Sequence, residues 1–145
     1  MRVDFYLLDA DPVEAVAPLL ARKTLEAGKR LCIAAREQEL RARLDRALWE
    51  REGDAFLAHG AANDSNAARQ PILLGENTTI ANDATFAMVA DGIWREEARA
   101  FERVMLLFGE DRRQAARELW KAFSAEEELE KNFLKQEGGR WQRLG

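Results

Sequence analysis

Residues 3 to 35 constrain the fold most, because two apolar segments flank one helical pattern. VDFYLL (3–8) and RLCIAA (30–35) carry the β-branched, aromatic and aliphatic residues typical of buried strands. The helix predicted between them has Asp11 as its cap and Pro12 at its first position, and it ends at Gly28. A strand, a helix and a second strand within roughly thirty residues predict a right-handed βαβ unit with a parallel strand pair.

The remaining pattern extends this unit into one α/β domain. Further strands are predicted at 54–59, 71–75, 84–91 and 103–108, and helices at 36–51, 111–123 and 124–136. A chain of 145 residues has the usual size of one domain. Residues 1–145 are therefore predicted to form a single three-layer domain, with a mostly parallel central sheet and helices on both faces.

Three segments carry weaker patterns. Residues 60–70 are rich in turn formers and are expected to form a polar loop, while residues 92–101 are expected to contain one or two helical turns. Ser124, with Glu127 three residues later, predicts the start of the helix at 124–136. Residues 137–145 contain two glycines and little periodicity, so we expect a tail there that is either loose or packed only through Trp141.

Composition excludes several classes of protein. The net charge of -4 and the pI near 5.2 argue against a general binder of phosphate backbones, whose affinity depends on cationic contacts. The single cysteine, Cys32, excludes an internal disulfide, and its apolar surroundings predict burial in a cytoplasmic protein. No apolar run has the length that a membrane crossing needs, and Met1 leads directly into the first predicted strand.

Signals of catalysis are weak. The sequence contains neither G-x-G-x-x-G nor G-x-x-x-x-G-K-[ST], so no glycine-rich turn is available for a pyrophosphate. Asp9 and Asp11 follow the first predicted strand and could hold a magnesium ion or accept a phosphoryl group; alternatively, Asp11 only caps the helix and Asp9 is solvated. The only histidine, His59, lacks a recognisable nucleophile motif and is expected at the surface. No cofactor and no metal site are predicted.

The segment DRRQAARELWKAF (111–123) places three cations on one side of a helix. At about 100° per residue, Arg117 lies about 40° and Lys121 about 80° from Arg113, and Trp120 lies at the border of this stripe. The face toward the sheet is predicted to consist of Ala116, Leu119 and Phe123. An indole beside three cations suits an acidic peptide with an apolar anchor. The alternative is a solvated stripe with Trp120 at the edge of the core.

Trp49 is the second unusual residue, because it points about 150° away from the apolar face of the helix at 36–51. An indole opposite the core is a common anchor of protein–protein interfaces. Phe56 and Leu57 follow closely and extend the predicted patch. The alternative is that the neighbouring loop folds over Trp49.

Five segments in this order resemble the chi subunit of bacterial DNA polymerase III. They are VDFYLLDAD, GKRLCIAA, LDRALW, DAFLAH and ARELWKAF, and the resemblance extends from about residue 3 to residue 123. It implies a non-catalytic accessory protein of the clamp-loader assembly. Chi proteins bind the psi subunit of the clamp loader and the acidic, phenylalanine-ended C-terminal tail of single-stranded DNA-binding protein, so DNA would be contacted only indirectly.

The resemblance also implies which residues meet these partners. Arg117 and Lys121, with Arg113 one turn earlier, match the family's basic site for the acidic tail. Trp49 and Phe56 match its hydrophobic surface for psi. Two other classes of function remain open: a small metal-dependent phosphotransfer or nucleotide-processing enzyme, and a direct binder of single-stranded DNA, which would show steeply salt-dependent binding to oligonucleotides.

Overall fold

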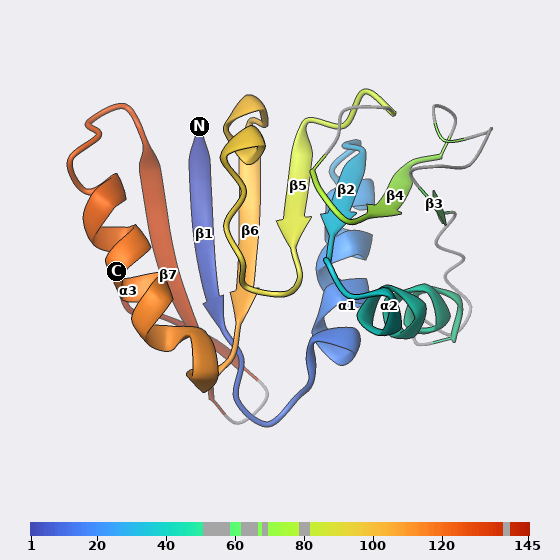
Figure 1. Cartoon of the computed structure of the whole chain (residues 1–145), viewed down its shortest axis with the longest axis horizontal. Coiled ribbons are helices and arrows are strands. Elements are labelled where there is room, and N and C mark those ends of the chain that lie inside the picture. The colour runs from blue at the N-terminus through green and yellow to red at the C-terminus, as the bar shows by residue number, and fades with distance from the viewer. Residues whose placement is uncertain (51–58, 62–66, 68–69, 79–81, 138–139) are drawn as a thin grey trace.

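A twisted β-sheet runs through the whole molecule (Figure 1). The computed structural model of the chain describes residues 1–50, 59–61, 67, 70–78, 82–137 and 140–145. The strands are β1 (Arg2–Leu7), β2 (Leu31–Ala34), β3 (His59–Ala61), β4 (Ile72–Gly75), β5 (Phe86–Val89), β6 (Arg103–Phe108), β7 (Glu130–Glu137) and β8 (Arg140–Arg143). Their order in the described sheet is β3-β4-β2-β5-β6-β1-β7-β8. All neighbours pair in parallel except β7 and β8, which confirms the mostly parallel sheet.

The N-terminal βαβ unit forms, but its two strands do not pair with each other. β1 lies between β6 and β7, and β2 lies between β4 and β5, so two strands separate them in the sheet. The connecting helix α1 spans Val13–Glu26. Gly28 follows two residues after its end, and the φ of 76° at this glycine allows the amide nitrogens of Gly28 and Lys29 to donate back to the last turn.

The predicted start of α1 was wrong in one detail. Pro12 is the cap residue and no side chain caps the helix. The Asp11 carboxylate instead accepts a hydrogen bond of 2.7 Å from Nε2 of Gln136 in β7. The side chain of Asp11, which the local pattern assigned to helix capping, therefore binds Gln136, a residue distant in sequence.

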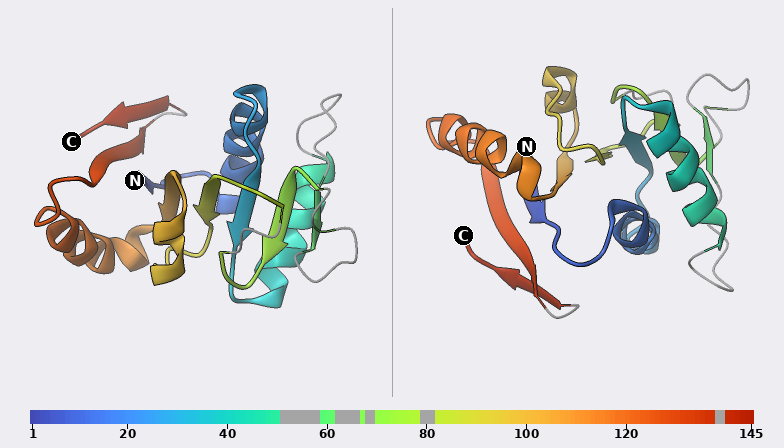
Figure 2. Two further views of the ribbon diagram at one scale, coloured as in Figure 1. Left: turned by 90° about the horizontal axis from the view of Figure 1, so that it is seen from above. Right: turned by 60° about the horizontal axis from the view of Figure 1, so that its bottom comes forward.

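Helices cover both faces of the sheet, as predicted. α1 and α2 (Gln38–Glu50) pack on one face, and α3 (Arg113–Phe123) packs on the other with the short 3-10 helix η2 (Glu96–Ala100). Figure 2 shows α1 and α3 on opposite sides of the sheet. Alternate residues of β1 divide accordingly, with Tyr6 on the α1 side and Phe5 on the α3 side. A second short 3-10 helix, η3 (Glu110–Arg112), leads directly into α3.

The predicted helix at 124–136 was wrong, because residues 130–137 form the strand β7. Ser124 is the C-cap residue of α3 and does not start a helix. Its hydroxyl donates to the carbonyl oxygen of Trp120 at 2.9 Å. β7 fills the remaining edge of β1, with Phe133 stacked on Phe5 at 6.2 Å between ring centroids. Backbone pairing along this edge outweighs the helical propensity of a glutamate-rich segment.

The expected loose tail is also corrected. Residues 140–143 form β8, which pairs with β7, and the ring of Trp141 packs edge-on against Tyr6 at 5.1 Å. Leu144 continues this pairing, since its amide nitrogen donates to the carbonyl of Phe133 at 2.7 Å. The C-terminal segment therefore belongs to the sheet.

Two single residues complete the comparison with sequence. Cys32 is buried in β2, as predicted. His59, expected at the surface, is buried at the start of β3, and its Nε2 lies 2.7 Å from Oδ1 of Asp45.

Most of the strand predicted at 54–59 and of the loop at 60–70 lies outside the described residues. Among the helices that the structure describes, none has the length and apolar character needed to cross a membrane.

Candidate functional site

Helix α3 turns its apolar face to the sheet and its cations outward, as predicted. Ala116 and Phe123 are buried, and Phe123 packs against the rings of Phe5 at 6.2 Å and Trp94 at 5.0 Å. These contacts fix the rotation of the helix about its axis. The side chains of Arg117 and Lys121 are consequently exposed on the opposite side.

Trp120 lies at the border between the core and the cations. Its ring packs edge-on against Phe5 at 5.2 Å and against Phe133 at 5.9 Å. The ammonium nitrogen of Lys131 lies 4.6 Å from the centroid of the same ring. Trp120 is therefore a half-buried indole held by aromatic contacts that come from two strands.

A shallow hollow of about 290 Å³ opens beside this indole, and we call it the Trp120 hollow. Its lining consists of Arg117, Trp120, Phe133, Leu144 and Gly145. Backbone hydrogen bonds from Leu144 to Phe133 and from Phe133 to Gly145, of 2.7 and 3.2 Å, hold its two strand-side walls together. The hollow is thus mainly apolar, with one guanidinium at its edge.

The predicted stripe is divided by the structure. Arg117 and Trp120 meet in the Trp120 hollow, whereas Arg113 and Lys121 do not line it. Arg113 bonds Glu110 at 2.9 Å, a solvent-exposed pair that contributes little free energy and can be exchanged for another carboxylate. Within the part of the chain that the structure describes, Arg117 and Lys121 form no ion pair. Two of the three cations therefore remain available to an acidic ligand.

Besides Gly145, three side chains in or beside the Trp120 hollow were missed from sequence: Lys131, Phe133 and Leu144. All three lie in or after β7, in the region where a helix and a tail were predicted. The signal that could have found them is the Gly-Gly dipeptide at 138–139, since two glycines between short segments are typical of a two-residue hairpin. The stretch before it lacks alternation of apolar and polar residues, which hid the strand.

Trp49 forms a separate exposed feature on α2. Its side chain is 52% exposed, while Leu44 and Leu48 of the same helix are buried, so the predicted outward direction is confirmed. The Trp49 ring rests on the ring of His59, at 4.7 Å between centroids. Phe56 and Leu57, predicted to extend the patch, lie outside the described residues.

The carboxyl ends of the central strands carry acidic residues. A hollow of about 400 Å³ there is lined in part by Asp9, Asp11, Asp91, Glu110 and Asp111. The amide nitrogen of Asp9 donates to Oε1 of Gln136, the same side chain that binds Asp11. Among the described residues, no group of three or more His, Cys, Asp or Glu side chains is arranged to hold a metal ion.

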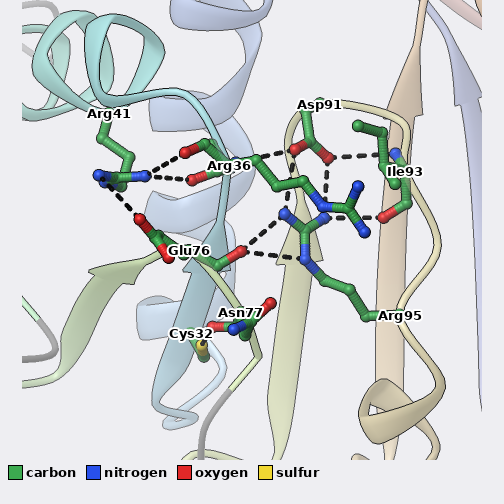
Figure 3. Close-up of polar contacts among 9 residues, drawn as sticks. Cys32, Arg36, Arg41, Glu76, Asn77, Asp91, Ile93 and Arg95 are labelled. Carbon is green, nitrogen blue, oxygen red and sulfur yellow. Dashed lines mark hydrogen bonds and ion pairs between the residues drawn. The ribbon is translucent and has the colours of Figure 1, made fainter.

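Next to this edge, the buried guanidinium of Arg95 binds several loops together (Figure 3). It donates to both carboxylate oxygens of Asp91 at 2.8 and 3.0 Å, and to the carbonyl oxygens of Glu76 and Ile93. Burial raises the pKa of Asp91, but the hydrogen bonds from Arg95 and from the amides of Arg36 and Ile93 outweigh it and leave that pKa below its ordinary value. This network stabilises the loops that follow β4 and β5.

Comparisons with known proteins point to one family. Residues 1–129 match the model of the family described as "DNA polymerase III chi subunit, HolC". The chain is 29% identical to DNA polymerase III subunit chi of Escherichia coli (strain K12) over 142 residues, covering 82% of this chain and 88% of that protein. It is 36% identical to DNA polymerase III subunit chi of Pseudomonas aeruginosa over 77 residues, covering 51% of this chain and 53% of that protein.

Proposed function

Because the chain belongs to the DNA polymerase III chi subunit family, we propose that it links the clamp loader to single-stranded DNA-binding protein. The link to the clamp loader is a psi subunit, and the link to the binding protein is its acidic C-terminal tail. The family assignment itself makes the chain an accessory subunit in DNA replication, not a catalytic one. It replaces the alternative of a phosphotransfer enzyme that uses Asp9 and Asp11. The proposed place of action is the cytoplasm.

The Trp120 hollow is the observation that carries the tail assignment. Its volume of about 290 Å³ is at the low end for small-molecule sites, so it suits one anchoring side chain rather than a whole cofactor. An aromatic residue can pack on Phe133 and Trp120, while Arg117 at the edge binds a nearby carboxylate. An acidic peptide that ends in phenylalanine offers both groups. The net charge of -4 favours such a local site over general binding of DNA.

Tethering explains how a weak contact at this hollow becomes useful. Many copies of the binding protein coat one template, and the clamp loader holds the chi-like subunit close to them. Linkage of this kind raises the local concentration of tails, so a modest intrinsic affinity is sufficient. Such contacts at an exposed helix are expected to weaken as salt is added.

Replacement of Arg117 by alanine is expected to weaken binding of an acidic, phenylalanine-ended peptide about tenfold, because one charge-assisted bond is lost. Titration calorimetry at low salt measures the effect. Arg46→Ala is the matched control, since Arg46 is an exposed arginine of α2 on the other face of the sheet. Equal affinities of the wild type and the Arg117 variant would remove this residue from the site.

Replacement of Trp49 by alanine is expected to lower the affinity for psi about thirtyfold or more, as truncation of an interface anchor does. Co-purification with psi, followed by titration, measures it. Leu19→Ala is the matched control because Leu19 is another exposed apolar residue, 54% exposed on α1. Recovery of the Trp49 variant with psi at the wild-type yield would place the psi surface elsewhere. An unchanged melting temperature would show that the variant still folds.

A further inference from the structure

β7 supplies a wall of the Trp120 hollow that lies across from α3. Lys131 and Phe133 are two positions apart in this strand, so their side chains project from the same face of the sheet. The register places them beside Val3 and Phe5 of β1, and both of these residues belong to the core under α3. Lys131 is therefore directed to the side of the sheet on which α3 lies.

The ammonium group of Lys131 is held beside an aromatic ring but has no carboxylate partner among the described residues. Its nitrogen lies 4.6 Å from the centroid of the Trp120 ring. Among the described residues, no carboxylate forms an ion pair with it, whereas Arg2, Arg99 and Arg103 each bind an internal carboxylate. A ring face satisfies an ammonium group only weakly at an exposed site. Its three N–H donors can therefore still bind an incoming carboxylate.

We propose that Lys131 is a second cation of the peptide site, so that the acidic tail is bound between α3 and β7. This inference rests on the proposed function. One carboxylate of the tail binds Arg117 on the helix, another binds Lys131 on the strand, and the apolar anchor enters the Trp120 hollow beside the indole that Lys131 contacts. The indole contacts the tail and also holds Lys131 in position through its ring face.

This arrangement differs from a stripe confined to one helix. Arg113 already binds Glu110. Neither Lys121 nor Lys131 lines the hollow itself, but the ammonium group of Lys131 lies over the ring of Trp120, which does. One cation on α3 and another on β7 give the ligand contacts on two elements, which fixes the direction of an extended peptide better than a single row of cations does. The acidic residues and the terminal anchor of the tail are thereby recognised together.

Replacement of Lys131 by glutamine is expected to weaken the binding of a fluorescently labelled acidic peptide with a C-terminal phenylalanine about fivefold at low salt. Glutamine keeps most of the aliphatic stem and removes the charge, so β7 and the contact with Trp120 are preserved. Lys131→Glu is expected to weaken binding further. Fluorescence anisotropy with the full chain measures both affinities. Lys23→Gln is the matched control, because Lys23 is an exposed lysine of α1 on the opposite face of the sheet.

The outcomes separate this inference from the proposed function. If Arg117→Ala weakens binding and Lys131→Gln stays within a factor of two of the wild type, the inference is wrong and the peptide site remains on α3. If the wild-type chain does not bind the peptide, the proposed function fails and the inference fails with it. A loss with Lys131→Gln at an unchanged melting temperature, while Lys23→Gln binds as the wild type does, supports the two-walled site.

Discussion

Replacing Arg95 with methionine is expected to lower the free energy of unfolding by about 3–5 kcal/mol, the range found when one partner of a buried ion pair is removed. The Arg95 side chain is 2% exposed and the Asp91 side chain 11% exposed. Methionine fills similar space but leaves the Asp91 carboxylate without its bidentate partner. It also leaves the carbonyl oxygens of Glu76 and Ile93 without the donors that now satisfy them.

Urea unfolding at pH 7 measures this loss, and its pH dependence identifies the cause. The pKa of folded Asp91 lies below the ordinary value of 3.8, so the wild type gains stability from this group above that pH. The gain disappears as the pH falls through the lower, folded pKa. In the Arg95→Met variant the lowering by the guanidinium is lost while burial still acts, so the pKa of Asp91 is expected to be higher than in the wild type. The difference in stability between the two proteins should therefore narrow below about pH 4.

Arg99→Met is the matched control, because Arg99 binds two glutamates at the surface and its side chain is 38% exposed. Solvent screens that network, and only a small change in stability is expected. Arg95→Lys should fall between the two, since an ammonium group keeps the charge but cannot reproduce the planar fork. Equal losses for Arg95→Met and Arg99→Met would mean that the buried network contributes no more than a surface one.

Replacement of Asp4 by alanine is expected to cost about 3 kcal/mol of unfolding free energy. The Asp4 carboxylate is fully buried in β1, and it accepts hydrogen bonds from Arg2 at 3.0 Å, Arg103 at 2.8 Å and Asn132 at 2.9 Å. Both arginines are partly exposed and can turn toward water, which keeps the expected cost at the lower end of the range for buried pairs. Thermal and urea unfolding measure it.

The Asp4 contact also connects stability to the candidate site. Asn132 is the neighbour of Lys131 and Phe133 in β7, so loss of its bond to Asp4 loosens the strand that forms one wall of the Trp120 hollow. We expect Asp4→Ala to weaken peptide binding as well as stability. Glu26→Ala, in an exposed pair with Arg22, serves as the control. A stability loss no greater than that of the control would show that the three donors are equally well satisfied by water.

The local elements were predictable from sequence because their determinants are local. The apolar run of β6, the face of α3 and the glycine that ends α1 each depend on residues within a few positions. The exposed direction of Trp49 follows from helical period alone. For the same reason, Trp120 was placed correctly at the border of the apolar face, next to the stripe that contains Arg117, and both residues line one hollow.

Contacts between distant segments decided the rest. Asp11 bonds Gln136 instead of capping a helix, and His59 is buried beside Asp45. Both outcomes depend on which elements become neighbours in the sheet. Phe56 and Leu57 stay predictions, because they lie outside the described residues.

The sequence by itself determined the α/β class, the parallel strands and the cationic face of α3, since periodicity and turn residues act over short range. Only the tertiary structure decided that residues 130–137 form a strand. The backbone groups at the free edge of β1 need hydrogen-bond partners, and β7 supplies them. Phe133 also stacks on the ring of Phe5. Together these contacts outweigh the helical preference of a glutamate-rich segment. Because residues 130–137 form a strand, Lys131 lies beside Trp120, and the candidate site is a hollow lined by α3 and by the C-terminal strands rather than a stripe on one helix.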